Sequence, residues 1–500
     1  MNRSKVLITL GVMLSLFLAS MEATVVATGM PTIVSQLGGL DIYSWVFSAY
    51  MLAATATVPI FGKLSDLFGR RPVYLVAMGL FLAGSLLCGL AQSMAQLIAF
   101  RIVQGLGAGG VLPLAFVIVG ALFSFEQRAK VQGVFAGVWG ISSLVGPLLG
   151  GFLVDQVSWR WIFYINLVPG LLAAALIGFV WVDEARPAGA GAVSVDYAGA
   201  ILLSMGVAAL LLGLFEVRTP VGRLLLVLAA GAFAVLWRVE HAAADPVLPL
   251  RLFRDRLFAA ASAHGVLAGC AVFGGVAFVP LFVQAVMGTS ATAAGATLMP
   301  LMLGWVAASI IGSRLLLVVG YRPVAVTGMA SLTIGTFLMA QIGEQTGHGF
   351  LLASLALMGI GMGLSVPSLM IAVQTAVARH DLGTATSTLQ FMRSIGGAVG
   401  VSVMGLVLSL RLAGTLAAAG ADPAAVSLNR LLDPLVRASA ATGLEAVLRA
   451  ALAGAIRGVF IIAFVTAAAG LAATALAPRG RIAQLAAARA EATATSAGGK

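Results

Sequence analysis

Charged residues are scarce in this sequence. Asp, Glu, Lys and Arg make up 9% of the 500 residues, and only 18 of them are acidic. A soluble globular domain carries about 25% charged residues and roughly 45–50% apolar residues, whereas 60% of this chain is hydrophobic. No soluble core absorbs that excess of apolar side chains. The composition therefore excludes a soluble globular enzyme.

Cysteine and histidine are also rare. The two cysteines, Cys88 and Cys270, both lie in apolar runs, so they exclude a disulfide-rich secreted scaffold and do not indicate the redox compartment. Four histidines are scattered without metal-ligand spacing. No cluster of acids, histidines or nucleophiles suggests catalysis. We therefore expect neither enzymatic activity nor a bound metal or cofactor.

Long apolar runs dominate what remains. About fourteen of them have roughly 18–28 residues, enough for a helix to cross a hydrocarbon layer of about 30 Å. Barrel strands would instead show short alternating segments. The sequence predicts an all-α integral membrane protein with fourteen transmembrane helices, whose approximate spans are 6–33, 44–62, 73–92, 96–122, 131–154, 161–182, 198–216, 222–238, 257–286, 294–318, 323–342, 350–377, 383–410 and 456–477.

The basic residues predict the orientation. The net charge is +11, but the Lys and Arg residues sit in short loops between spans, which argues against nucleic acid as a partner. With a cytoplasmic N-terminus, 19 of the 29 basic residues lie on the cytoplasmic side and eight on the other. The positive-inside rule therefore places both termini in the cytoplasm. We expect a multi-pass protein of the inner (cytoplasmic) membrane.

The chain repeats itself. The glycine-rich stretch 105–113 matches 359–367 at an offset of 254, and 69–72 matches 320–323 at an offset of 251. Two separate matches at nearly one offset indicate two parallel halves of six spans around an inserted pair. Parallel halves are one known transporter architecture, with the substrate site between them. The alternative is that glycine-rich helices resemble one another by composition.

Several motifs together resemble a known family. The stretch GKLSDLFGRRP at 62–72, expected as a loop after the second span, resembles the cytoplasmic signature of the major facilitator superfamily. Arg101–Gly105 is similar to its second motif, and 146–151, GPLLGG, to the antiporter motif of the fifth span, where Ser142 replaces a usual glycine. With 159–166 and 21–26, these motifs resemble the fourteen-helix drug:proton antiporter branch.

That resemblance implies the major facilitator fold: two parallel six-helix halves plus two inserted helices. The expected domains are an N-terminal half at 1–184, an inserted pair with cytoplasmic linkers at 185–256, a C-terminal half at 257–478 and a cytoplasmic tail at 479–500. The longest outside loop, at 411–455, carries leucines and valine at helical spacing from Leu444 to Leu452, which predicts an amphipathic surface helix.

Glu22 is the one acidic residue predicted deep within a span, and an intramembrane carboxylate is by default functional. At 1.5 Å per residue, Glu22 lies about 24 Å and Arg101 about 22 Å from the cytoplasmic edge. Because the resemblance places both spans around one cavity, a coupling of Glu22 and Arg101 is reasonable. Neither charge recurs at the repeat offset, so proton chemistry is expected in the N-terminal half.

The pair suggests a mechanism of competition. Burial favours the protonated form of a carboxylate, whereas a guanidinium or a bound cation favours the ionised form. Glu22 can therefore hold a proton in an empty cavity and release it when a cationic substrate arrives, which is antiport. The alternative is that Glu22 and Arg101 form a permanent structural ion pair.

A second group of residues is expected to gate the transporter. In the 62–72 stretch, a carboxylate at the cytoplasmic face can bond a neighbouring helix N-terminus or an arginine in one state and release it in another. In the fifth span, glycines allow close helix approach and a proline removes a backbone hydrogen bond. The gating candidates are Gly62, Asp66, Gly69, Arg70, Arg71, Gly146, Pro147, Gly150 and Gly151.

The substrate candidates are sparse polar groups among Phe, Met and Leu, which suits hydrophobic, amphipathic molecules, cationic ones in particular. They are Glu22, Tyr50, Gln104, Gln284, Gln390 and Arg393. The sequence thus predicts a monomeric, proton-driven exporter of such drugs or toxic compounds, in contact with membrane lipids. A proton-coupled exporter of a native metabolite, lipid or fatty acid stays open, as does a non-transporting receptor with this fold.

Overall fold

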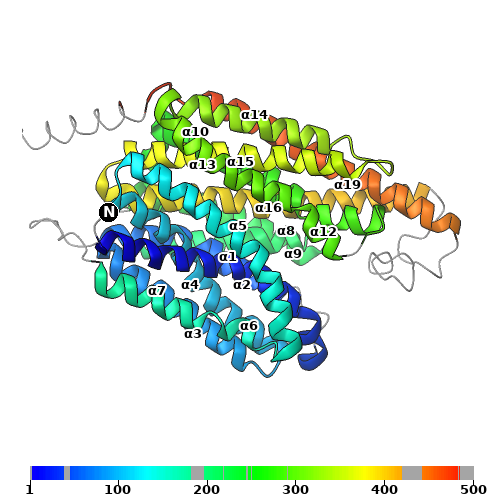
Figure 1. The fold of residues 1–500 in the computed structure, drawn as a ribbon, viewed down its shortest axis with the longest axis horizontal. Helices are drawn as coiled ribbons and strands as arrows, with labels where there is room; N and C mark the ends of the chain where they lie inside the picture. Colours follow the sequence, from blue (N-terminus) through cyan, green and yellow to red (C-terminus); the bar gives the residue numbers. More distant parts are fainter. Residues whose placement is uncertain are drawn as a thin grey trace, which may run out of the picture. The chain divides into compact units, whose positions relative to one another are not determined.

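The structure is a computed structural model that describes residues 3–38, 45–181, 196–217, 219–243, 246–248, 250–289, 291–418, 442–481 and 484. These residues form helices joined by short turns, with no strand among them (Figure 1). The elements of the first half are α1 (Arg3–Leu37), α2 (Trp45–Phe68), α3 (Arg70–Leu90), α4 (Met94–Leu122), α5 (Phe125–Gln156), α6 (Trp161–Tyr164) and α7 (Leu167–Val180), followed by α8 (Tyr197–Phe215) and α9 (Pro220–Ala242).

The remaining elements follow a short 3-10 helix, η1 (Leu250–Arg254). They are α10 (Arg256–Val276), α11 (Val279–Leu281), the π-helical turn η2 (Phe282–Val286), α12 (Ala291–Thr297), α13 (Met299–Val319), α14 (Tyr321–Met339), α15 (His348–Ala376), the 3-10 turn η3 (Arg379–Asp381), α16 (Leu382–Ala418) and α19 (Thr442–Ala475). Among the described residues, twelve helices are long and apolar enough to cross a membrane. Because α5 and α14 are not among these twelve, the count of fourteen spans stays a prediction.

The chain divides into two compact units. The first contains residues 1–259, 370–391 and 482–500, and the second contains 260–369 and 392–481. Each unit has its own apolar core. The core of the first unit gathers side chains such as Leu16, Phe81 and Phe163, and the core of the second gathers Phe282, Met358 and Phe460. The predicted domain boundaries are not decided by this division and stay a prediction.

The glycine-rich stretch of α4 packs α4 tightly against two neighbours. A methyl group on Gly105 would overlap the backbone of Tyr50 in α2, and one on Gly107 would overlap the backbone of Phe81 in α3. Gly109 meets Ala54 of α2 in the same way. Such close approach requires glycine, because any side chain would push the helices apart. The stretch is therefore a packing surface between helices.

The second unit repeats this packing at the offsets seen in the sequence. Gly359 of α15 would overlap Leu301 of α13, Gly361 would overlap Leu332 of α14, and Gly363 would overlap Trp305 of α13. The α15 glycines lie 254 positions after their α4 counterparts, and the residues they meet lie 251 positions after Tyr50, Phe81 and Ala54. The internal repeat is thus a structural repeat of three packed helices.

Two regions differ from expectation. The stretch 62–72 is not a loop: α2 continues to Phe68, α3 begins at Arg70, and Gly69 alone turns the chain with a φ of 93°. Gly320 makes the same turn with the same φ at the repeat offset of 251. The predicted helix after Leu444 is the beginning of α19 and continues directly into the last span, with Leu452 buried in the second core. Apolar periodicity does not mark where one continuous helix leaves the membrane.

Candidate functional site

The centre of the candidate site is an ion pair inside the first unit. Glu22 lies on α1 and is 0% exposed, and Arg101 lies on α4 and is 2% exposed. Arg101 Nη1 donates to Glu22 Oε1. The two charges that the helical rise places at one depth are therefore in direct contact. Removing two charges from water is costly, so such a pair persists only where further hydrogen bonds satisfy both groups.

Arg101 is held on several sides. Its Nε donates to the carbonyl oxygen of Val46 at 3.0 Å, and its Nη1 also donates to Gln104 Oε1 at 2.7 Å. The Tyr50 ring, on α2, packs against the guanidinium group with 4.0 Å between Cζ and the ring centroid. Fixed planar donors and a cation–π contact suit arginine better than lysine. These contacts hold the guanidinium in one orientation beside Glu22.

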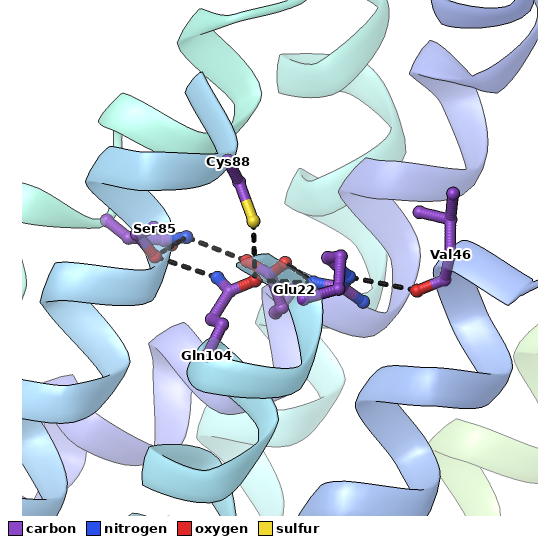
Figure 2. A network of polar contacts seen from close by, with 7 residues as sticks. Glu22, Val46, Ser85, Cys88 and Gln104 are labelled. Atoms are coloured by element: carbon purple, nitrogen blue, oxygen red, sulfur yellow. Dashed lines mark hydrogen bonds and ion pairs between the residues drawn. The ribbon is translucent and has the colours of Figure 1, made fainter. Parts of the chain in front are cut away.

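A second layer of polar groups surrounds the pair (Figure 2). Gln104 Nε2 donates to Ser85 Oγ at 2.7 Å, and the Cys88 thiol lies 3.8 Å from Gln104 Oε1. Ser85 and Cys88 both come from α3, one helical turn apart. In this network Gln104 accepts from Arg101 and donates to Ser85. The predicted substrate residues Tyr50 and Gln104 thus lie at the proposed proton site, where both contact Arg101.

Asn166 completes the coordination of Glu22. Its Nδ2 donates to Glu22 Oε2 at 2.7 Å and to Ser85 Oγ at 3.2 Å. Asn166 lies between α6 and α7, where the helix is interrupted. Pro169 explains the interruption, because proline lacks a backbone N–H and its ring clashes with the carbonyl of the fourth residue before it, here Ile165. The break places an amide at the level of Glu22.

Sequence reasoning missed Ser85 and Asn166 as members of the site. Asn166 belongs to the stretch 159–166 that carries the family resemblance, but no role follows from that. The available signal was an amide three residues before a proline within an apolar span. A small hydroxyl such as Ser85 carries no comparable signal, because serines occur in many of the spans.

The gating candidate Asp66 contacts the start of a distant helix. Its Oδ1 accepts from the backbone N–H of Gly383 at 2.9 Å, and its Oδ2 accepts from the N–H and hydroxyl of Thr384 at 2.7 and 2.8 Å. These donors belong to the first turn of α16, so the carboxylate caps a helix N-terminus, where unpaired N–H groups favour a negative charge. Of the two expected contacts, this structure has the helix N-terminus.

The helices meet closely at this point. A methyl group on Gly62 would overlap the Ser387 side chain, and one on Gly383 would overlap Ser65 and Asp66. Arg70 and Arg71 are the first residues of α3, directly after the turn at Gly69. Glycine at 62 and 383 therefore allows α2 and the first turns of α16 to approach until Asp66 reaches the backbone donors.

Replacing Asp66 with asparagine is expected to weaken this contact. Gly383 and Thr384 donate to both carboxylate oxygens, and asparagine replaces one of these two acceptors with an NH2 donor. A hydrogen bond to a charged group is worth about 1.5–3 kcal/mol. A free-energy change of about 1–3 kcal/mol shifts the equilibrium between the inward- and outward-facing states by roughly 5–150-fold. Labelling rates of cysteines introduced on either side of the membrane, in a Cys88→Ala/Cys270→Ala background, would measure this shift.

Asp255→Asn is the matched control for Asp66→Asn. Asp255 also accepts from helix N–H groups, those of Leu257 and Phe258, but it caps its own helix and links no distant segments. We expect its labelling rates to stay at the wild-type level. Unchanged labelling in Asp66→Asn would reject a gating role for Asp66.

The glycines of α5 are not all explained by packing. Gly146 and Gly150 are buried, but a methyl group on Gly151 would meet no atom of the described residues within 4 Å. The helix is continuous through this region. The side chain of Pro147 lies outside the described part of the chain. Close helix approach therefore does not account for Gly151, and its gating role stays a prediction.

The other substrate candidates lie elsewhere in the two units. Gln284 is a half-buried residue of η2 and Arg393 a half-buried residue of α16, both in the second unit, whereas Gln390 of α16 is buried and belongs to the first. Their role in substrate binding stays a prediction. Among the described residues, no group of three or more His, Cys, Asp or Glu is arranged to hold a metal ion.

Comparison with known sequences finds one family model and several relatives named as transporters or efflux pumps. The sequence model of the Major Facilitator Superfamily matches residues 12–401. Multidrug transporter protein MdtP of Bacillus subtilis (strain 168) is 38% identical over 413 residues, covering 81% of this chain and 76% of that protein. Multidrug resistance protein 3 of the same organism is 36% identical, covering 80% and 79%. Efflux pump dotC of Dothistroma septosporum is 33% identical, covering 80% and 70%.

Comparison with solved structures shows the same fold. The human organic anion transporter MFSD10 (TETRAN) superposes with a TM-score of 0.61 at 16% identity, covering 93% of this chain and 100% of that chain. The proton:xylose symporter XylE superposes with a TM-score of 0.59 at 13% identity, covering 92% and 94%. At these identities the likeness concerns the fold alone.

Proposed function

The chain belongs to the major facilitator superfamily, and from this membership we propose that it is a proton-coupled antiporter that exports hydrophobic, cationic compounds from the cytoplasm. It is a multi-pass membrane transporter, and its relatives are named multidrug transporters and efflux pumps. The proposal adds the proton as coupling ion, the charge of the substrate, and alternating access as the mechanism. It also adds the cytoplasmic membrane, with both termini in the cytoplasm, and a monomeric state.

The observation that carries the proposal is the fully buried Glu22 in contact with Arg101. A carboxylate in the membrane interior is costly, and in membrane proteins such groups mark ion and proton pathways. Arg101 favours the ionised form of Glu22, and burial favours the protonated form. Two opposed influences of this kind allow a group to change its protonation when its surroundings change, as antiport requires.

Competition would couple the two ligands. When a cationic substrate enters, its positive charge favours the ionised form of Glu22 and the proton leaves. When the substrate leaves, Glu22 can take up a proton again. Asp66 and the α5 glycines would then govern which side of the membrane the cavity faces. No cofactor is needed, because the proton gradient supplies the free energy.

Transport into proteoliposomes with an imposed pH gradient tests the proposal. We expect hydrophobic cations, offered in a panel with anionic and fatty-acid-like compounds, to move against their gradient and to drive proton movement in the opposite direction. Collapsing the pH gradient should stop this transport. Transport that ignores the gradient would overturn proton coupling, and coupled transport of fatty acids or anions alone would favour export of a native metabolite or lipid. A receptor with this fold would transport nothing.

A further inference from the structure

The amide of Asn166 has one oxygen that the site does not use. Its Nδ2 bonds Glu22 and Ser85, but within the described part of the chain its Oδ1 is buried without a hydrogen-bond partner, and the residue is 0% exposed. The orientation of the amide is set by Glu22, because a carbonyl oxygen turned toward an ionised carboxylate would place two acceptors face to face. A buried acceptor without a partner is unfavourable.

This arrangement favours the ionised form of Glu22. Both carboxylate oxygens receive hydrogens: Oε1 from Arg101 and Oε2 from Asn166. Each carboxylate oxygen has two lone pairs, and a proton added on the lone pair that accepts from Arg101 or from Asn166 would face an N–H group. At Oε1 no rearrangement brings an acceptor to the added proton, because the guanidinium of Arg101 has donors and no acceptor. At Oε2 a rearrangement is available, because the amide of Asn166 carries an acceptor oxygen on its other side.

We propose that Asn166 is a positioning residue that follows the protonation of Glu22 by a half-turn of its side-chain amide. With Glu22 ionised, Nδ2 donates to Oε2, as in this structure. With Glu22 protonated at Oε2, the amide turns and Oδ1 accepts the new O–H. The inference rests on the proposed function, because it presumes that Glu22 exchanges a proton.

Ser85 allows both orientations of the amide. Its oxygen accepts from Gln104 and Asn166, and its own hydroxyl hydrogen has no acceptor among the described contacts (Figure 2). After the half-turn, Asn166 Oδ1 lies where Nδ2 was, and the Ser85 hydroxyl can donate to it. The previously unused acceptor of Asn166 then has two donors, one from Glu22 and one from Ser85.

Among the described titratable groups near Glu22, Arg101 is the one bonded to it, and a guanidinium supplies no acceptor. The described titratable groups close enough to interact electrostatically within this cluster are Arg101 on α4, Tyr50 on α2 and Cys88 on α3. Arg101 is donor-only, Tyr50 packs its ring against Arg101, and Cys88 lies against Gln104. Asn166 is the described neighbour bonded to Glu22 that can change from donor to acceptor without changing its charge.

Difference infrared spectroscopy of the purified protein between low and high pH tests the proposal. The carboxylic acid C=O band of Glu22 is identified by its loss in Glu22→Gln. In Asn166→Leu we expect this band to move to higher frequency, because the acid O–H has lost its acceptor. Ser15→Ala removes a buried hydroxyl of α1 that is bonded to Tyr74, and it should leave the band in place. An unmoved band in folded Asn166→Leu would mean that Asn166 is a fixed donor.

A second measurement needs no change at Asn166. The chain has three asparagines, at 2, 166 and 429, so carbon-13 labelling of asparagine in an Asn2→Ser/Asn429→Ser background reports on Asn166 alone. We expect its amide band to shift with pH at the same midpoint as the Glu22 band. A pH-independent amide band would overturn the half-turn while leaving proton coupling intact. A wild-type spectrum without a Glu22 acid band would instead overturn the proposed function and this inference together.

Discussion

Replacing Glu22 with glutamine is expected to reduce gradient-driven export to the background of protein-free liposomes. The amide has nearly the shape of the carboxylate but cannot lose a proton, so the substrate has no proton to displace. Folding and some substrate binding should survive at reduced stability, because the side-chain oxygen of the introduced glutamine can still accept from Arg101, although the guanidinium loses its counter-ion. Proteoliposome transport with an imposed pH gradient, and substrate binding to the purified variant, measure the two effects separately.

Glu344→Gln is the matched control for this substitution. Glu344 is an exposed carboxylate beyond the end of α14, and its neutralisation should leave transport unchanged. Measurable proton-driven export by purified Glu22→Gln would show that another group carries the proton. The assignment of Glu22 would then be wrong even if the protein is a drug exporter.

Replacing Arg101 with leucine is expected to be strongly destabilising. Breaking a buried ion pair by removing one partner costs about 3–5 kcal/mol, mostly because the other charge is left unpaired. Glu22 would keep only the Asn166 bond, and the carbonyl of Val46 would lose the guanidinium as a donor. Thermal unfolding in detergent should show the loss. Arg457→Leu removes an exposed arginine that donates to the carbonyl of Ala340 and should cost only about 0.5–1.5 kcal/mol.

The double variant Glu22→Gln/Arg101→Leu separates stability from proton chemistry. With both charges removed, most of the stability should return, and transport should match that of Glu22→Gln alone. In Arg101→Leu, if it folds, the protonated form of Glu22 should be favoured, because the neighbouring positive charge is gone. Substrate-driven proton release should therefore shift to higher pH. A folded Arg101→Leu that releases protons at unchanged or lower pH would reject the coupling.

The depth of Glu22 and Arg101 in the membrane could be read from the sequence, because a helix advances a fixed 1.5 Å per residue. Two charges on different spans at one depth are candidates for contact. Which side of each helix faces the other is not fixed by depth. Only the structure shows that α1 and α4 turn these two side chains toward each other, so that they form an ion pair.

Asn166 shows the limit of that reasoning. Pro169 marked a break in the helix, but nothing in the sequence said that this break would bring the amide of Asn166 to Glu22 and Ser85. Asp66 is similar. The sequence left a helix N-terminus and an arginine open as its partner, since a carboxylate complements either, and the backbone of Gly383 and Thr384 lies more than 300 residues away along the chain.

By itself, the sequence determined the all-helical membrane architecture, the internal repeat and the family, because apolar length, glycine spacing and motifs are local properties of the chain. The helices that Gly105 and Gly359 pack against became known only from the structure. Only the tertiary structure decided the partners of Glu22 and Asp66, the extension of α2 through Asp66, and the unused oxygen of Asn166. These depend on helix rotation and on helix ends, which are set by packing between distant segments and leave no pattern in the local sequence.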